Sequence, residues 1–242
     1  MRLAIITYPR SNGYQYLHET LADMERQDPS VRGHEVCVFV DALEAPKLPG
    51  WVQVKTAHFD HLLLRTRLNL LNALNMQRAL RWLSEAGPHG MLLEDDVIFV
   101  RGWLEKAIAL AWAVHRQAGA LPWALKLEHW GRETPVQDQG FQKWSPEQEI
   151  WGTQSYIMPS MFSHLLAKMQ QIGIDKHRGI YTKTYGDYLI QHIIRQVPPM
   201  AELYVANACL TKHVGEISGA YPDRLLGEYT AASFEETDRN PS

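Results

Sequence analysis

Residues 91–100 place three consecutive acidic residues inside an apolar run, Met-Leu-Leu-Glu-Asp-Asp-Val-Ile-Phe-Val. Apolar residues at successive positions are typical of a strand that is buried on both faces, as the strands of parallel sheets are. Carboxylates are rarely buried unless they are paired or bound to a metal, so folding alone does not call for this cluster. The segment predicts an α/β fold in which Glu94, Asp95 and Asp96 lie at the edge where open sheets bind ligands.

The three carboxylates also indicate what such an edge would bind. Oxygen ligands suit Mg²⁺ or Mn²⁺, and sites for these ions commonly hold the metal together with substrate phosphates. We therefore expect a metal–diphosphate site at residues 94–96. The alternative is a strand followed by a solvated acidic turn, which is a common arrangement.

Strand and helix patterns alternate along the chain, which favours a mostly parallel central sheet flanked by helices. Short apolar runs predict strands at residues 3–7, 35–40, 52–54, 91–93, 123–127, 155–158 and 203–206. Helical spacing of apolar residues predicts helices at residues 14–24, 66–85, 104–112, 162–169 and 187–197. The polar segment 128–152 is expected to be a substrate loop. We predict one domain over residues 1–226 and a polar, mobile tail over residues 227–242.

Composition narrows the class of protein. The 242 residues carry a net charge of -3, which argues against bulk binding to nucleic acid or to an anionic membrane. No apolar run reaches the length of a membrane span, and the first apolar run is too short for a signal peptide. The two cysteines, Cys37 and Cys209, lack zinc-binding spacing, and Cys37 lies within a strand pattern. We expect a reduced, cytoplasmic protein.

Other polar segments follow a predicted strand or begin a predicted helix. Helix starts favour anions because their first backbone N–H groups are free, and guanidinium groups bind phosphates with two donors. The candidates for nucleotide and phosphate contacts are Thr7, Tyr8 and Arg10 after the first strand, and Arg65, Arg67 and Asn69 around the start of the long helix. A solvated helix start is the alternative for the two arginines of that second group.

Two single residues extend the candidate set. Asp187 stands where a helix is predicted to begin, so it is either a functional carboxylate or a plain N-cap. His213 follows a predicted strand, where a neutral imidazole could complete a metal shell. Single histidines are more often structural, which is the alternative for His213.

Several motifs, in this order along the chain, resemble those of the GT-A glycosyltransferases, and most of all the N-acetylglucosaminyltransferase IV type (glycosyltransferase family 54-like). They are YLHETL (16–21), RTRLN (65–69), LLEDDV (92–97), LKLEHWG (125–131), GDYLIQHII (186–194) and KHVGEISG (212–219). The resemblance implies a single-domain, Rossmann-like GT-A fold. It also implies transfer of a GlcNAc-like sugar or a hexose from a nucleotide-diphosphate donor, expected to be a UDP-sugar, to an acceptor hydroxyl with inversion.

The resemblance further implies roles for the acidic cluster, which takes the place of the family's DXD motif. Asp96 would hold Mn²⁺ or Mg²⁺ against the donor diphosphate, and His213 would add a metal or phosphate contact. Glu94 and Asp95 would orient the ribose, the sugar or metal-bound water. The polar residues after the first strand and around the start of the long helix would contact the donor.

Asp187, at the matching helix start, is the expected base that deprotonates the acceptor hydroxyl, and Glu128 is the second choice. Three alternatives stay open. They are a metal-dependent nucleotidyltransferase, a non-catalytic module that binds a sugar nucleotide or glycan, and a lipooligosaccharide-type glycosyltransferase with a similar L-E-D-D segment. The acceptor is also open among a glycan, a lipid-linked sugar, a protein and a modified nucleobase, and so is the choice between inversion and retention of configuration.

Overall fold

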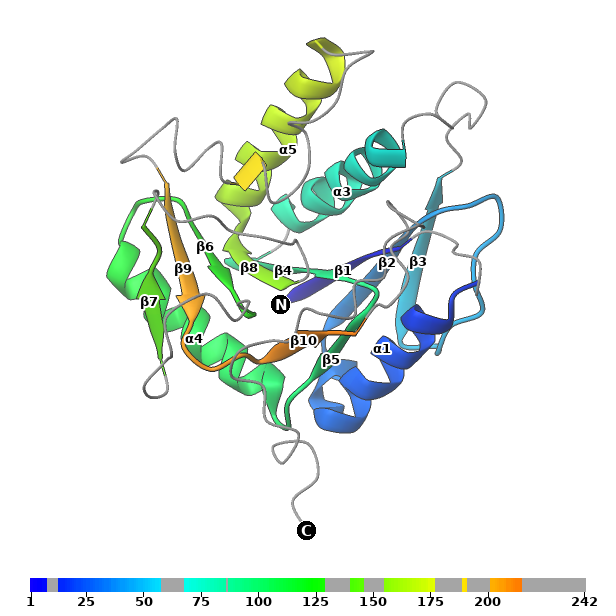
Figure 1. Ribbon diagram of the computed structural model, residues 1–242, viewed down its shortest axis with the longest axis horizontal. Helices are drawn as coiled ribbons and strands as arrows, with labels where there is room; N and C mark the ends of the chain where they lie inside the picture. The colour runs from blue at the N-terminus through cyan, green and yellow to red at the C-terminus, as the bar shows by residue number, and fades with distance from the viewer. Residues whose placement is uncertain are drawn as a thin grey trace.

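The computed structural model describes residues 1–7, 13–57, 68–85, 87–128, 140–145, 155–176, 189–190 and 201–214. Its centre is an eight-stranded sheet with the strand order β3-β2-β1-β4-β8-β6-β9-β7 (Figure 1). These strands are β1 (Arg2–Thr7), β2 (Glu35–Asp41), β3 (Val52–Ala57), β4 (His89–Glu94), β6 (Trp123–Lys126), β7 (Phe141–Lys143), β8 (Ser155–Pro159) and β9 (Glu202–Ala206).

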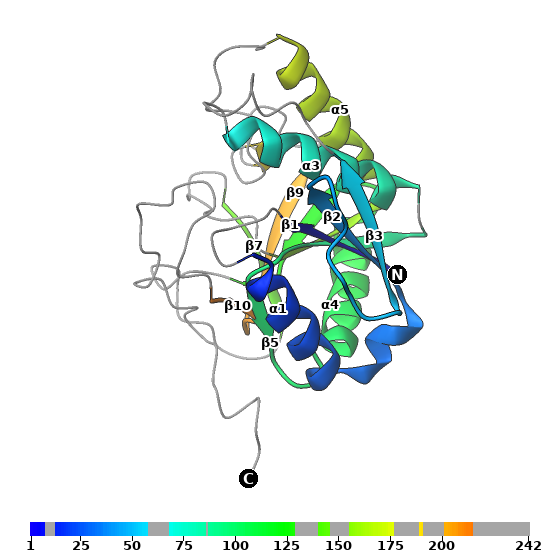
Figure 2. The ribbon, with the colours of Figure 1, turned by 90° about the vertical axis from the view of Figure 1, so that its right-hand side faces the viewer.

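Helices cover both faces of this sheet. The pair α3 (Leu68–Ser84) and α5 (Ser160–Lys176) lies on one face, and α1 (Gln15–Gln27) and α4 (Trp103–Ala118) lie on the other (Figures 1 and 2). A short 3-10 helix, η1 (Pro29–Gly33), joins α1 to β2. The predicted α/β class, with helices flanking a mostly parallel sheet, is confirmed.

Alternate residues of the central strands enter two separate hydrophobic cores. In β1, Leu3 and Ile5 pack with the core that α1 and α4 contribute to, whereas Ala4 and Ile6 pack with the core under α3 and α5. All four side chains are at most 3% exposed. Because both faces are covered, the strand reads as a continuous apolar run, which is why the sequence predicted it.

Strand directions are mixed beyond β4. Strands β3, β2, β1 and β4 are parallel neighbours, and β6 runs parallel to β9. Strand β8 is antiparallel to β4 and β6, and β7 is antiparallel to β9. The short edge strand β7 lies inside segment 128–152, which the sequence predicted to be loop; this part of the prediction is wrong because β7 is too short and too exposed to show a strand pattern.

A second, two-stranded sheet stands beside the large one. It pairs β5 (Val97–Phe99) with β10 (Thr211–His213) in antiparallel register. The prediction that residues 203–206 form the last strand is therefore wrong, since β10 follows it. With only three residues, β10 is too short for an apolar period to appear.

Several predictions fall partly or wholly outside the described residues, among them the tail 227–242 and most of the loop 128–152. Of the helix predicted at 187–197, only residues 189–190 are described, and they are helical. No helix in the described part of the chain combines the length and apolar character that crossing a bilayer requires. Cys37 is buried in β2, and burial raises the pKa of its thiol to about 11.

Candidate functional site

The acidic cluster lies where the chain passes from the large sheet to the small one. Strand β4 ends at Glu94 and β5 begins at Val97, so Asp95 and Asp96 form the bend between them. Both bend residues are only 3% exposed, whereas Glu94 is half-buried. The alternative of a solvated acidic turn does not hold for Asp95 and Asp96. Their carboxylates face the interior at the carboxyl edge of the parallel strands.

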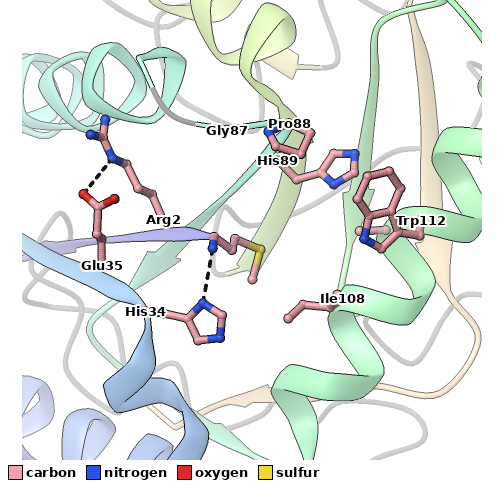
Figure 3. A pocket seen from close by; sticks show the side chains of 10 residues that line it. Arg2, His34, Glu35, Gly87, Pro88, His89, Ile108 and Trp112 are labelled. Atoms are coloured by element: carbon pink, nitrogen blue, oxygen red, sulfur yellow. Dashed lines mark hydrogen bonds and ion pairs between the residues drawn. The ribbon is translucent and has the colours of Figure 1, made fainter.

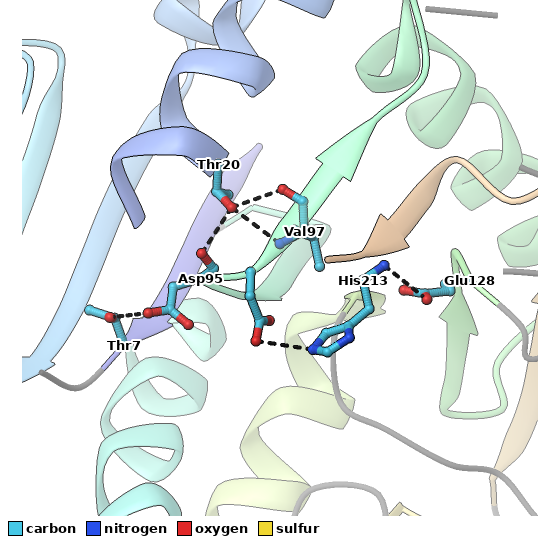
Figure 4. Close-up of polar contacts among 7 residues, drawn as sticks. Thr7, Thr20, Asp95, Val97, Glu128 and His213 are labelled. Atoms are coloured by element: carbon cyan, nitrogen blue, oxygen red, sulfur yellow. Dashed lines mark hydrogen bonds and ion pairs between the residues drawn. The ribbon is translucent and has the colours of Figure 1, made fainter. Parts of the chain in front are cut away.

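Asp95 is held by the neighbouring strand. The register pairs Ile6 of β1 with Glu94 of β4, which brings the next residues, Thr7 and Asp95, side by side. The Thr7 hydroxyl donates a hydrogen bond to Asp95 Oδ2 (Figure 4). Thr7 was predicted as a donor-binding residue. In this structure it orders a carboxylate of the acidic cluster.

The small sheet brings Asp96 against His213. Residues His213 and Val97 are register partners, and the Val214 N–H donates to the Asp96 carbonyl at 2.8 Å. The His213 Nε2 and Asp96 Oδ2 atoms are 3.0 Å apart, although the residues are 117 positions apart in the sequence. The two residues predicted as metal ligands are therefore direct neighbours, and both are buried.

The charge of Asp96 determines the protonation of His213. Burial alone would lower the pKa of the imidazole, but the negative charge and hydrogen bond of Asp96, with smaller effects from Glu94 and Glu128, raise it to about 9. Without a bound cation the imidazole is therefore protonated at neutral pH, and the contact is an ion pair. A metal that binds to Nε2 would have to displace this proton.

Glu128 adjoins the same pair from the end of β6. It is 1% exposed, and its Oε1 accepts a hydrogen bond from the His213 backbone N–H at 3.1 Å. Its Oε2 is buried and has no hydrogen-bond partner among the described residues. Burial raises the pKa of this carboxyl; the charges of Lys126 and His213 and the backbone hydrogen bond oppose that shift, and Asp96 adds to it. Glu128 is thus a carboxyl that gains a proton more readily than an exposed glutamate.

The 3.0 Å between Asp96 Oδ2 and His213 Nε2 is an ordinary hydrogen-bond length, and it is also compatible with two neighbouring ligands of one divalent cation. Two ligands at right angles on an octahedral ion, each about 2.1 Å from it, lie about 3.0 Å apart. That is the separation of Asp96 Oδ2 and His213 Nε2, 3.0 Å. Within the described ranges, no set of three or more His, Cys, Asp and Glu side chains is arranged to hold a metal.

Three buried polar residues that the sequence analysis did not select support this edge. On α3, Asn75 Nδ2 donates to the carbonyls of Thr7 at 3.0 Å and Phe39 at 2.7 Å, which ties together the ends of β1 and β2. On α1, Thr20 and Asp23 bond to the backbone of the segment that follows the acidic bend. A buried polar side chain within an otherwise apolar helical stripe is a sequence signal that could have found them, and Thr20 also lies inside the YLHETL motif quoted above.

The predicted site residues divide into two groups. The structure brings together the six that lie in the described ranges: Thr7, Glu94, Asp95, Asp96, Glu128 and His213. The others fall outside the described residues: Tyr8, Arg10, Arg65, Arg67 and Asp187, together with the side chain of Asn69, whose backbone belongs to α3. The predicted contacts of this second group stay predictions.

A cavity of about 210 Å³ lies elsewhere, near the start of β1, β2 and β4 (Figure 3). Arg2 and Glu35, on its wall, already form an ion pair at 3.0 Å, and His34 Nδ1 contacts the amino group of Met1 at 3.2 Å. Because the cavity lies at the starts of these strands and the acidic bend follows the end of β4, the two are at opposite edges of the sheet. The bend, with its buried Asp96–His213 pair, is the better candidate site.

Comparisons with known proteins found no match to the chain, either among the protein-family models or among the curated proteins that were searched.

Proposed function

We propose that this protein is a metal-dependent glycosyltransferase, which moves a sugar from a nucleotide-diphosphate donor to an acceptor hydroxyl with inversion. A UDP-sugar is the expected donor. The observation that carries the proposal is the buried contact between Asp96 and His213 at the carboxyl edge of the sheet. Its atomic separation suits one divalent cation, and few protein ligands leave room for a diphosphate.

The residues of the bend would mainly bind the metal and orient the donor. Asp96 Oδ2 and His213 Nε2 would hold Mn²⁺ or Mg²⁺, which when bound neutralises negative charge on a departing nucleoside diphosphate. Asp95, ordered by the Thr7 hydroxyl, and Glu94, which is more exposed, would orient the ribose, the sugar or coordinated water. Because the site is largely shielded from water, these charged contacts are stronger than they would be at the surface.

A base is needed to deprotonate the acceptor hydroxyl as it attacks the anomeric carbon. Asp187 is proposed for this role on the resemblance of its segment to the family motif. Glu128 has independent support as the second choice, because it contacts the backbone of His213 and keeps one carboxylate oxygen without a partner among the described residues. Its raised pKa brings it closer to the working range of a general base near neutral pH.

A donor screen tests the proposal. The protein is incubated with UDP-, GDP- and CMP-linked sugars and Mn²⁺, and released nucleotide is measured with and without excess EDTA. We expect release of a nucleoside diphosphate that requires the metal and is lost in Asp96→Asn. Glu85→Gln, which removes an exposed acid between α3 and the start of β4, at the opposite edge of the sheet from the bend, is the matched control and should keep wild-type turnover.

The outcomes separate the other readings of the site. Release of pyrophosphate from a nucleoside triphosphate would identify a nucleotidyltransferase, because the attack is then on phosphorus. Donor binding without hydrolysis or transfer would identify a binding module. Full activity in Asp96→Asn, or in the wild type with EDTA, would refute the assignment of the metal site.

A further inference from the structure

The side chain of Thr20 is hydrogen-bonded on both sides of Asp96. Thr20 lies on α1, is 1% exposed, and points at the bend between β4 and β5 (Figure 4). Its Oγ1 lies 2.9 Å from the Asp95 carbonyl oxygen and 2.8 Å from the Val97 carbonyl oxygen. The same atom accepts a hydrogen bond from the Val97 N–H at 3.1 Å.

These contacts restrain both backbone dihedral angles of Asp96. The Asp95 carbonyl belongs to the peptide plane that precedes Asp96, and the Val97 N–H belongs to the plane that follows it. Fixing the two planes fixes φ and ψ of the residue between them. A threonine hydroxyl has one proton and two lone pairs, so it can accept from the Val97 N–H while it donates to the Asp95 carbonyl. In that arrangement Thr20 bonds to both peptide planes that flank Asp96; the Val97 carbonyl belongs to neither plane.

We propose that Thr20 is a positioning residue, which sets the direction of the Asp96 carboxylate and thereby the affinity of the site for a divalent cation. The part of this inference that concerns the metal rests on the proposed function. The part that concerns the Asp96 backbone rests only on the contacts described above.

Among the contacts described above, two others of Asp96 restrain different parts of the residue. The Val214 N–H bonds to the Asp96 carbonyl and so restrains only the following peptide plane. His213 Nε2 contacts the carboxylate oxygen of Asp96 but not the Asp96 backbone. Asp23, which lies on α1 like Thr20, accepts a hydrogen bond through Oδ2 from the Phe99 N–H at 2.8 Å. This bond holds β5 at Phe99, two residues after Val97. Thr20 alone of these residues bonds to both peptide planes.

The test compares Thr20→Val, which keeps the shape of the side chain but has no hydroxyl, with Thr20→Ser, which keeps the hydroxyl. Leu166→Ala, in the core on the opposite face of the sheet, is the control for lost stability. Two quantities are measured: the exchange rate of the Val97 amide by NMR, and the Kd for Mn²⁺ alone by isothermal titration. Should Thr20→Val not fold, Thr20→Ala leaves space for water to replace the hydroxyl.

In Thr20→Val we expect the Val97 amide to exchange at least about tenfold faster than in Leu166→Ala, because its acceptor is gone. Removing a residue that orients a metal ligand typically weakens binding about 10- to 100-fold, and we expect such a rise in the Kd for Mn²⁺. Thr20→Ser should restore both quantities to near the wild-type values.

Equal Val97 exchange in Thr20→Val and Leu166→Ala would overturn the inference. So would faster exchange with an unchanged Kd, because the hydroxyl would then order the backbone without directing the carboxylate. A wild-type protein that binds no Mn²⁺ would instead overturn the proposed function, and the metal part of the inference with it. The exchange rates would still decide whether Thr20 fixes the bend.

Discussion

The contact between His213 and Asp96 predicts that the metal-free protein loses stability as the pH rises above neutrality. In the folded protein the pKa of His213 is about 9, against an ordinary value of 6.5. A raised pKa means that the folded state holds the proton more tightly, so the stabilisation is complete below pH 6.5 and lost as the pH passes 9. At about 1.4 kcal/mol for each pKa unit between 6.5 and about 9, the loss amounts to at most about 3.5 kcal/mol.

Metal binding should show the opposite dependence on pH. Because Mn²⁺ must displace the imidazole proton, its affinity should rise about tenfold for each pH unit below the pKa of His213. At pH 7 only about 1% of the imidazole is unprotonated and at pH 9 about half is, so affinity should increase roughly 50-fold between pH 7 and pH 9. The same imidazole proton thus accounts for the pH dependence of stability and for that of Mn²⁺ affinity. Without the Asp96–His213 pair, neither dependence is expected.

Urea unfolding in EDTA between pH 6 and pH 9.5 measures the first trend, and Mn²⁺ titration over the same range measures the second. His213→Gln should flatten both curves, since glutamine does not titrate. His18→Gln, which removes an exposed histidine, is the control and should follow the wild type. If the stability difference between the wild type and His213→Gln does not change with pH, the ion pair is not present in the folded protein.

Three further predictions concern the base, the core and a second histidine. Asp187→Asn should keep its capping ability and lower transfer by about 100-fold or more in steady-state assays; an unchanged rate would make Glu128→Gln the variant to test. Gly90→Ala should cost about 1–3 kcal/mol in denaturant unfolding because its Cβ would lie 2.8 Å from Leu83 Cδ2. The double variant with Leu83→Ala should lose less stability than the sum of the two single losses, because the two side chains share this contact. Burial and a neighbouring histidine lower the pKa of His89 from 6.5 to about 4. At most about 3.5 kcal/mol of stability should therefore be lost between pH 6.5 and pH 4, and His89→Phe should remove that loss.

Burial on both faces made the central strands predictable from sequence. A strand covered on both sides needs apolar residues at every position, which leaves a local pattern in β1 and β2. The direction of a strand leaves no such pattern. The residues of β8 are buried whether the strand runs with β4 or against it, so its antiparallel pairing had to come from the structure.

The candidate site was predictable where its residues are chemically unusual for their place. Asp95 and Asp96 stand out because carboxylates rarely occur in a buried segment. His213 was selected from its surrounding motif, but its contact with Asp96 depends on the pairing of β10 with β5, which sequence spacing does not reveal. Thr20 was missed because a threonine beside an apolar helical stripe is ordinary, and its partners lie 75 and 77 residues away.

The chain's change of sheet explains why structure and chemistry meet at the bend. When β4 leaves the large sheet, backbone groups lose their ladder partners, and buried ones need others. Thr20 and the N–H of Val214 supply those partners. The need for backbone partners does not explain the buried ionisable side chains. Asp96, Glu128 and His213 are all at most 7% exposed. Well-packed apolar residues often stabilise a protein as much as a buried ion pair does. Hydrogen-bonding needs therefore account for the hydroxyl and amide contacts of the bend, whereas the proposed divalent cation would account for its carboxylates and imidazole.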